Sequence, residues 1–99
     1  MVIDRLQKTK FDRGHIIIRQ GDVGNSLYFL VSGECETEIT SENGDVFKTT
    51  VYNQPGDYFG ELSLLQNAPR AATITATTEV VVLSIDKTTF LDLLIPIAS

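Results

Sequence analysis

The chain has 99 residues, of which 42% are hydrophobic and 21% are charged, a composition typical of one soluble globular domain with a modest core. Its formal net charge is −5, and no basic cluster occurs along it. These features argue against nucleic acid and anionic membranes as main partners, because both require a cationic surface. No apolar run reaches the roughly 18 residues of a membrane span, and residues 1–10 do not resemble a signal peptide. We therefore expect a cytoplasmic protein.

Six segments are predicted as β-strands because they are short, rich in β-branched and aromatic residues, and bounded by turn residues. They are, in chain order, residues 15–19, 27–32, 34–40, 46–52, 74–76 and 80–85. Asn43-Gly44 predicts a hairpin between two of them, and Pro55-Gly56 fits a type II turn. Short strands at this spacing predict a mainly β fold, an antiparallel β-roll of jelly-roll type with a short internal helix and terminal helices.

Both ends of the chain are predicted to be helical at least in part. Residues 1–10 are interpreted as the end of a helix or as a linker. Near the other end, Asp86 is a suitable N-cap for a helix that Pro96 would end. The apolar stripe of this helix consists of Phe90, Leu91, Leu93 and Leu94.

The residues most often used in catalysis and metal binding are scarce. The single cysteine, Cys35, cannot form an internal disulfide, and its strand setting predicts a small core residue. The single histidine, His15, has no neighbouring cysteine or histidine cluster and is predicted to be a polar residue at a strand edge. Neither residue belongs to a nucleophile or metal motif. We therefore predict that the domain is not an enzyme and holds no metal or cofactor.

One stretch, residues 59–76, combines features of an anion site. Gly60-Glu61-Leu62 is predicted to open a short helix, whose free N–H groups attract an anion. Arg70 follows nine residues after Glu61 and precedes the small residues Ala71 and Ala72. An arginine with room around it suits a phosphate, and a nearby carboxylate suits a sugar hydroxyl. The stretch therefore predicts a nucleotide site. A phosphodiesterase could use the same pair, but hydrolysis would require a metal cluster or a placed base.

The same stretch resembles the phosphate-binding cassette of cyclic nucleotide-binding domains, as found in the regulatory subunits of cAMP-dependent protein kinase and in cGMP-dependent protein kinases. The resemblance rests on residues 60–64 and on Pro69-Arg70-Ala71-Ala72-Thr73, and it extends over about residues 14–94. It implies that Arg70 binds the cyclic phosphate and Glu61 the ribose 2′-hydroxyl. It also implies backbone amide donors in the short phosphate-binding helix and beside the arginine. The full predicted ligand set is Gly60, Glu61, Leu62, Ser63, Arg70, Ala71 and Ala72.

Two positions, Ser63 and Asn25, differ from patterns common in the family, and a third, Ala71, distinguishes two of its branches. Ser63 stands where alanine is frequent, which should leave the backbone N–H usable. Asn25 stands where kinase regulatory subunits carry an aspartate that pairs with the cassette arginine, so we expect weaker coupling between Arg70 and this turn. Ala71 resembles the cAMP-dependent branch, whereas the cGMP-dependent branch often has a threonine that can reach guanine. The resemblance therefore favours cAMP over cGMP.

We expect a sensor module that binds cyclic nucleotide, performs no chemistry and regulates a protein kinase catalytic domain, in trans or in cis. The alternatives are a cGMP-binding module of a cGMP-dependent kinase, or the cyclic nucleotide-binding domain of a channel or an exchange factor. Residues 1–99 would form a single domain, and this domain-only length suggests a fragment of a longer regulatory or kinase chain.

Overall fold

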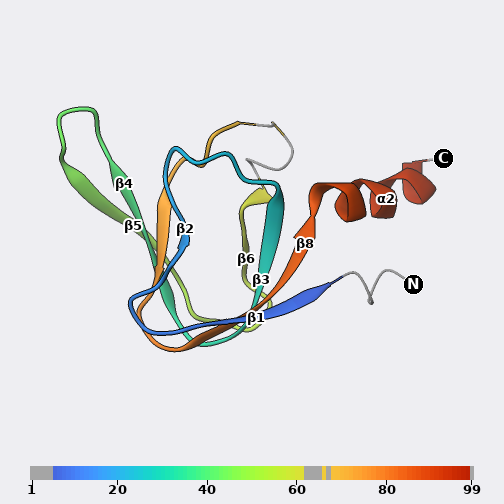
Figure 1. The fold of residues 1–99 in the computed structure, drawn as a ribbon, viewed down its shortest axis with the longest axis horizontal. Helices are drawn as coiled ribbons and strands as arrows, with labels where there is room; N and C mark the ends of the chain where they lie inside the picture. Colours follow the sequence, from blue (N-terminus) through green and yellow to red (C-terminus); the bar gives the residue numbers. More distant parts are fainter. Residues whose placement is uncertain (1–5, 62–65, 67, 99) are drawn as a thin grey trace.

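Two four-stranded antiparallel sheets form a roll in the protein, as the ribbon shows (Figure 1). This computed structural model describes residues 6–61, 66 and 68–98, of which residues 93–98 are described by their backbone alone. One sheet has the strand order β1-β8-β3-β6 and the other the order β2-β7-β4-β5. The strands are β1 (Gln7–Phe11), β2 (Ile16–Ile18), β3 (Ser26–Ser32), β4 (Cys35–Thr40), β5 (Val46–Tyr52), β6 (Tyr58–Phe59), β7 (Thr73–Ala76) and β8 (Val80–Asp86). The predicted antiparallel β-roll is confirmed.

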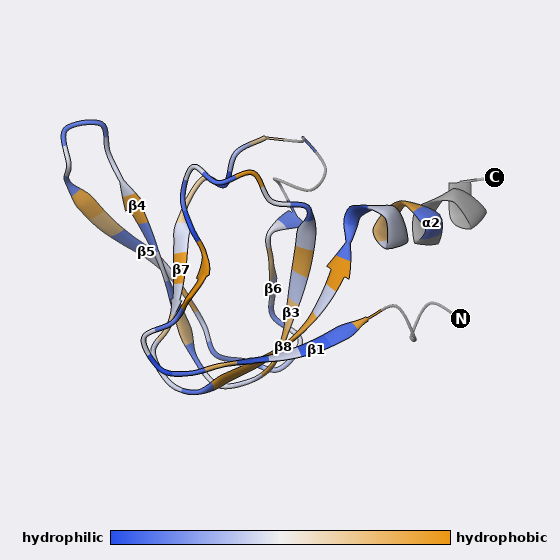
Figure 2. Ribbon diagram, viewed as in Figure 1, coloured by the Kyte–Doolittle hydropathy of each residue, from blue (hydrophilic) through white to orange (hydrophobic). Residues whose placement is uncertain are grey.

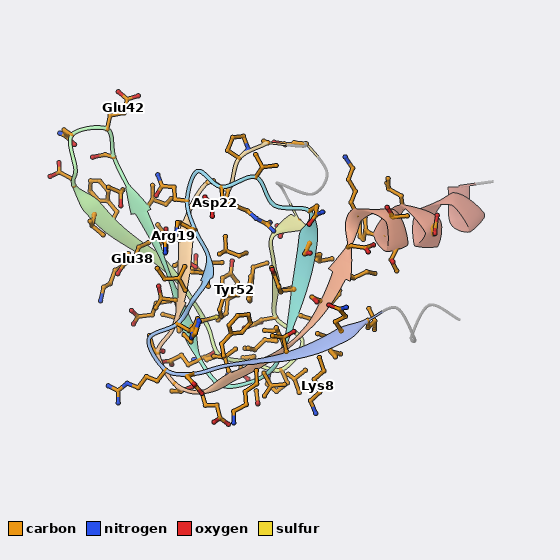
Figure 3. The ribbon with its side chains drawn as sticks, in the orientation of Figure 1. Lys8, Arg19, Asp22, Glu38, Glu42 and Tyr52 are labelled. Atoms are coloured by element: carbon orange, nitrogen blue, oxygen red, sulfur yellow. The ribbon has the colours of Figure 1, made fainter. Side chains whose placement is uncertain are left out.

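The core lies between the sheets because alternate side chains of each strand point inward. On β8, Val80 and Val82 are fully buried, and on β3 the matching inward residue is Leu30. Cys35 on β4 is also fully buried, as predicted for a small core residue, and burial raises the pKa of its thiol to about 11. Hydrophobic colours concentrate along these strands and hydrophilic colours in the turns (Figure 2). Among the labelled side chains, Tyr52 lies inside the roll whereas Glu42 points outward at the hairpin tip (Figure 3).

The two predicted turns have the expected backbone. Gly44 has φ +92° in the hairpin between β4 and β5, where Ser41 N–H donates to the carbonyl of Asp45 at 2.8 Å. Gly56 has φ +94°, and Asp57 N–H donates to the carbonyl of Gln54 at 3.0 Å, which closes a turn with Pro55 and Gly56 at its centre. A positive φ at the third turn residue is the requirement of a type II turn, so both sequence predictions are confirmed.

The helix or linker predicted for residues 1–10 is wrong over residues 7–10, which belong to β1. This strand pairs along its whole length with β8, from Gln7 opposite Ser84 to Phe11 opposite Val80. It lies at the edge of its sheet, and most of its side chains are exposed. An edge strand gains its backbone hydrogen bonds from one neighbour, so polar side chains are compatible with it and local pattern cannot reveal it. Residues 1–5 lie outside the described residues.

The C-terminal helix α2 (Lys87–Ala98) begins as the sequence predicts and ends later. The Asp86 carboxylate accepts the backbone N–H of Thr89 at 2.7 Å, which is the hydrogen bond of an N-cap. Thr89 is buried, and Phe90 packs against Leu27 and Ile85 at the end of the roll. The prediction that Pro96 ends the helix is wrong, because α2 continues to Ala98. A proline removes one N–H bond to the preceding turn and its ring crowds the carbonyl there, and both effects are tolerated here in the last turn.

The Asp86 cap yields a prediction about stability. Asp86→Ala should lower the free energy of unfolding by about 1 kcal/mol, because it leaves an N–H of the first turn of α2 without its acceptor. Asp86→Asn keeps an oxygen in place and should recover most of this loss. Urea denaturation of the three proteins measures the effect. Equal midpoints for wild type and Asp86→Ala would show that the cap does not stabilise the packed first turn.

Candidate functional site

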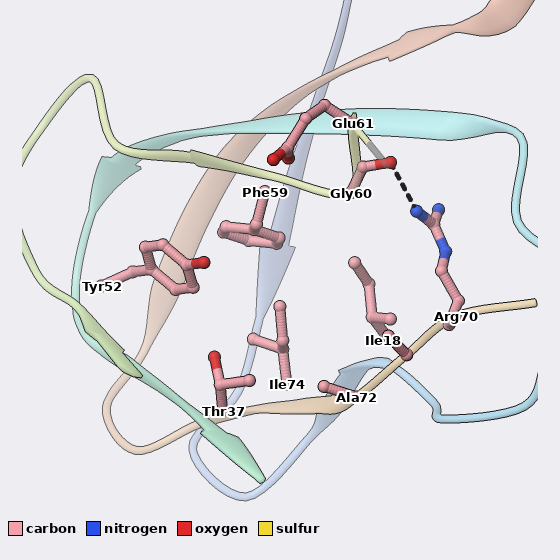
Figure 4. A pocket seen from close by; sticks show the side chains of 10 residues that line it. Ile18, Thr37, Tyr52, Phe59, Gly60, Glu61, Arg70, Ala72 and Ile74 are labelled. Carbon is pink, nitrogen blue, oxygen red and sulfur yellow. Dashed lines mark hydrogen bonds between the residues drawn. The ribbon is translucent and has the colours of Figure 1, made fainter. Parts of the chain in front are cut away.

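A cavity of about 140 Å³ opens between the strands of the roll, beside the segment that carries Gly60 and Glu61 (Figure 4). Its walls come from five strands, from Gly60 and Glu61 after β6, and from residues 70–72 before β7. The lining residues are Ile18, Thr37, Tyr52, Phe59, Gly60, Glu61, Arg70, Ala71, Ala72 and Ile74. Most of the wall is apolar, and the charged groups are Glu61 and Arg70. The cavity therefore combines an apolar body with one cation and one anion.

Arg70 is the most constrained residue of the site. Its side chain is only 6% exposed, and its Nη1 and Nη2 donate to the carbonyl oxygens of Gly60 at 2.9 Å and Ser26 at 2.8 Å. Burial lowers the pKa of the guanidinium, because the charged form loses hydration. A guanidinium carries five N–H groups, so these two bonds leave others available at the cavity wall. The guanidinium is therefore fixed in position and still has N–H donors for a further acceptor.

The backbone of Arg70 is fixed as firmly as its side chain. Its N–H donates to the carbonyl of Asp22 at 2.8 Å, and its carbonyl accepts the N–H of Gly21 at 2.8 Å. A β-bridge between Val23 and Pro69 extends this pairing. The chain before β7 is thus bound to the turn between β2 and β3, which places the guanidinium independently of any ligand.

Two glycines make room for the guanidinium. A Cβ at Gly24 would lie 2.0 Å from the Nε of Arg70, which is a steric clash. At Gly60 a Cβ would lie 2.8 Å from Nη1, and its φ of +94° also favours glycine. The sequence predicts Gly60 as a site residue and makes no such prediction for Gly24. A glycine in a turn is usually explained by the backbone conformation of the turn. The sequence alone therefore does not reveal that Gly24 also leaves space for the Arg70 guanidinium.

Glu61 lines the cavity from the residue next to Gly60. Its side chain is half-buried, and its carboxylate faces the part of the cavity formed by Phe59 and Tyr52 (Figure 4). The pKa of Tyr52 is raised, first by burial and then by the negative charge of Glu61. The carboxylate therefore places negative charge at the cavity wall, close enough to Tyr52 to raise its pKa.

The structure brings together the predicted ligand residues that it describes. Gly60, Glu61, Arg70, Ala71 and Ala72 all line the cavity. Leu62 and Ser63 lie outside the described residues, so their proposed amide contacts stay predictions.

Sequence analysis missed the other half of the wall, made by Ile18, Thr37, Tyr52, Phe59 and Ile74. These residues have the pattern of ordinary strand residues, which predicts packing. The packing is present, since the Tyr52 and Phe59 rings lie 5.1 Å apart. Nothing in a strand pattern tells which inward side chains face a cavity and which face the core.

Asn25 does not receive a guanidinium bond, because the hydrogen bonds of the Arg70 side chain go to Gly60 and to Ser26. The backbone carbonyl of Asn25 accepts the N–H of Lys87 at 2.9 Å, at the start of α2. Whether the change from aspartate weakens coupling stays a prediction.

Within the described part of the chain, no group of three histidine, cysteine, aspartate or glutamate residues is arranged to hold a metal ion. In the same part, no helix is long and apolar enough to span a membrane.

Comparison with protein families gives a match over residues 8–95 to the cyclic nucleotide-binding domain. The regulatory subunit of cAMP-dependent protein kinase from Colletotrichum orbiculare is 44% identical over 96 residues, which cover 97% of this chain and 24% of that protein. The chain thus spans about a quarter of the length of this relative.

Solved structures show the same fold. The catabolite activator protein of Thermus thermophilus superposes with a TM-score of 0.90 at 28% identity, covering 98% of this chain and 45% of that one. The cAMP-bound PfPKA-R superposes with a TM-score of 0.85 at 37% identity, covering 91% of this chain and 32% of that one.

The fit of Arg70 against Gly24 yields a prediction. Gly24→Ala should lower the free energy of unfolding by about 1–3 kcal/mol, the usual cost of overpacking a filled site. In an Arg70→Ala background the same substitution should cost much less, because the group that it clashes with is gone. Urea denaturation of the four proteins gives the coupling energy. An equal cost in both backgrounds would mean that Gly24 is required for its backbone and not for the guanidinium.

Proposed function

The chain belongs to the cyclic nucleotide-binding domain family, and we propose that its cavity binds a 3′,5′-cyclic nucleotide, with cAMP preferred over cGMP. The observation that carries this proposal is the buried guanidinium of Arg70. Among the described residues, no carboxylate forms an ion pair with it, and its side-chain partners are neutral carbonyl oxygens. A buried cation without a counter-ion is costly. An anionic ligand at the cavity wall would supply the missing charge.

A cyclic phosphate suits this position. Its oxygens can accept charge-assisted hydrogen bonds from the guanidinium N–H groups that the carbonyls of Gly60 and Ser26 leave free. The small side chains of Ala71 and Ala72 line the same wall and leave space for the phosphate. We assign the amides beside Arg70, and those of Leu62 and Ser63, to the same anion by resemblance to the family.

Glu61 suits the ribose. Its carboxylate lies next to Gly60 on the cavity wall and can accept a hydrogen bond from the 2′-hydroxyl. The positions of Arg70 and Glu61 then fix the ligand by both its phosphate and its sugar, which would distinguish a ribonucleotide from its 2′-deoxy form.

The preference for cAMP rests on Ala71 and on the relatives. Ala71 lines the cavity beside Arg70 and has no hydroxyl to offer the guanine amino group. The curated relative from Colletotrichum orbiculare is a cAMP-dependent protein kinase regulatory subunit, and PfPKA-R was solved with cAMP bound. A cGMP-binding module is the alternative, because alanine removes one guanine contact without blocking guanine.

We assign the domain a regulatory role. The matched family is the cyclic nucleotide-binding domain, and the curated relative described above is a regulatory subunit, which supports a binding module. We propose that cyclic nucleotide binding here controls a protein kinase catalytic domain, in trans or in cis. A channel or an exchange factor would be the alternative effector.

The proposal is tested by calorimetry with cAMP and cGMP. We expect saturable heat with both ligands, tighter binding of cAMP, and no 5′-monophosphate after long incubation. If neither cAMP nor cGMP gives heat, or if the 5′-monophosphate accumulates, the domain is not a binding module for cyclic nucleotides. Tighter binding of cGMP would reject the assignment of the base.

Substitutions of Arg70 and Glu61 should weaken cAMP binding by different amounts. Arg70→Ala should weaken cAMP binding by about 3–5 kcal/mol, the range for removing one partner of a buried charge pair. Arg70→Lys should recover only part of this, because lysine keeps the charge and loses the planar fork. Glu61→Gln should cost nearer 1–2 kcal/mol, since an acceptor remains.

The control ligand is 2′-deoxy-cAMP, measured with melting temperatures for all variants. Glu61→Gln should reduce discrimination against the deoxy ligand, whereas Arg70→Lys should not. Equal cAMP affinity in wild type and Arg70→Ala would end the phosphate assignment. Unchanged discrimination in Glu61→Gln would end the ribose assignment.

A further inference from the structure

Thr37 carries a buried hydroxyl that the fold does not use. The residue lies on β4 and is 7% exposed, and its Oγ1 has no hydrogen-bond partner among the described residues. Buried hydroxyls in folded proteins are nearly always paired, because an unpaired one loses its water without compensation. Thr37 also lines the cavity. An unpaired polar group at a cavity wall points to a ligand atom as its partner.

The sheet is irregular at this residue. β4 and β5 pair through Glu36 with Val51 and through Glu38 with Lys48, so that Thr49 and Thr50 of β5 stand opposite Thr37 alone. Two residues facing one is the arrangement of a β-bulge, a feature that recurs next to functional sites. On its other side Thr37 pairs with Ile74 of β7, which lines the cavity as well. The bulge therefore coincides with the one buried hydroxyl without a hydrogen-bond partner among the described residues.

We propose that the Thr37 hydroxyl forms a hydrogen bond with the base of the bound nucleotide. This inference rests on the proposed function, which places the phosphate at Arg70 and the ribose at Glu61. The base must then occupy the remaining part of the cavity. Thr37 lies there, across the cavity from Glu61 and on the side away from Arg70 (Figure 4). A hydroxyl both donates and accepts, so it suits the polar edge of a purine.

The wall around the Thr37 hydroxyl is apolar, so a polar atom of the base would find its hydrogen-bond partner in this hydroxyl. Its neighbours in the wall, Ile74 and Phe59, are apolar and buried. Tyr52 also has a hydroxyl, but its side chain is more exposed. Because no described residue forms a hydrogen bond with Thr37 Oγ1, a bond to the base would replace none of the recorded ones.

The test uses Thr37→Val, which has nearly the same shape and no hydroxyl. The ligands are cAMP and methyl riboside 3′,5′-cyclic phosphate, which has the same sugar and phosphate but no base. Thr37→Val should weaken cAMP binding about tenfold, the scale of one hydrogen bond. It should leave the affinity for the base-free ligand unchanged within about twofold, as expected for a contact that this ligand lacks.

Two further variants make the result independent of folding defects. Thr75→Val is the matched control, because Thr75 follows Ile74 on β7 and is not among the cavity-lining residues. It should leave both affinities unchanged. Thr37→Ser and Thr37→Ala form a second pair of similar size that differs in the hydroxyl. The same difference in cAMP affinity should separate them if Thr37→Val folds poorly.

Unchanged cAMP affinity in Thr37→Val would overturn the proposal, because the hydroxyl would then make no ligand contact. An equal loss for both ligands would overturn it too, because the contact would be with the sugar or the phosphate. Failure of the proposed function is separate and is seen in the wild type, which would then bind neither ligand.

Discussion

The hydrogen bonds from the Arg70 guanidinium to the carbonyls of Gly60 and Ser26 join three segments of the chain. They connect the chain after β6, the chain before β7 and the start of β3. The rest of the site depends on this junction, because it places a positive charge at the wall of an apolar cavity. Charged groups are rarely buried without a partner. The fold therefore holds a charge whose natural complement is an anion.

The same junction leads to the C-terminal helix through adjacent residues. Ser26 accepts from Arg70, while its neighbour Asn25 accepts from the N–H of Lys87 at the start of α2. A displacement of this short turn would alter both hydrogen bonds together. The first turn of α2 is also fastened by Asp86 and by the packing of Phe90. The binding site and the helix are thus joined by backbone contacts of a single turn.

Sequence reasoning succeeded where local chemistry decides the structure and failed where tertiary context does. Asn43-Gly44 and Pro55-Gly56 predicted their turns because positive φ angles favour glycine. The pairing of β1 with β8 was missed, because a polar edge strand carries no apolar alternation. Pro96 was over-weighted, since one lost hydrogen bond in a last turn does not end a helix.

The site shows the same division. Gly60, Glu61 and Arg70 could be found because their spacing forms a recognisable motif in one short stretch. The steric role of Gly24 could not, because it depends on Arg70, which is distant in sequence. The unpaired hydroxyl of Thr37 could not either, because only the fold shows that a buried hydroxyl lacks a partner. Glycine in a turn and threonine in a strand are ordinary residues until the fold is known.

The central claim is that the charge of Arg70 is completed by a cyclic phosphate. A crystal structure of the domain grown with cAMP tests it most directly. The account predicts phosphate oxygens within hydrogen-bond distance of the guanidinium, with the Gly60 and Ser26 contacts retained and the 2′-hydroxyl on Glu61. A phosphate bound away from Arg70, or a cavity left empty at saturating cAMP, would contradict it.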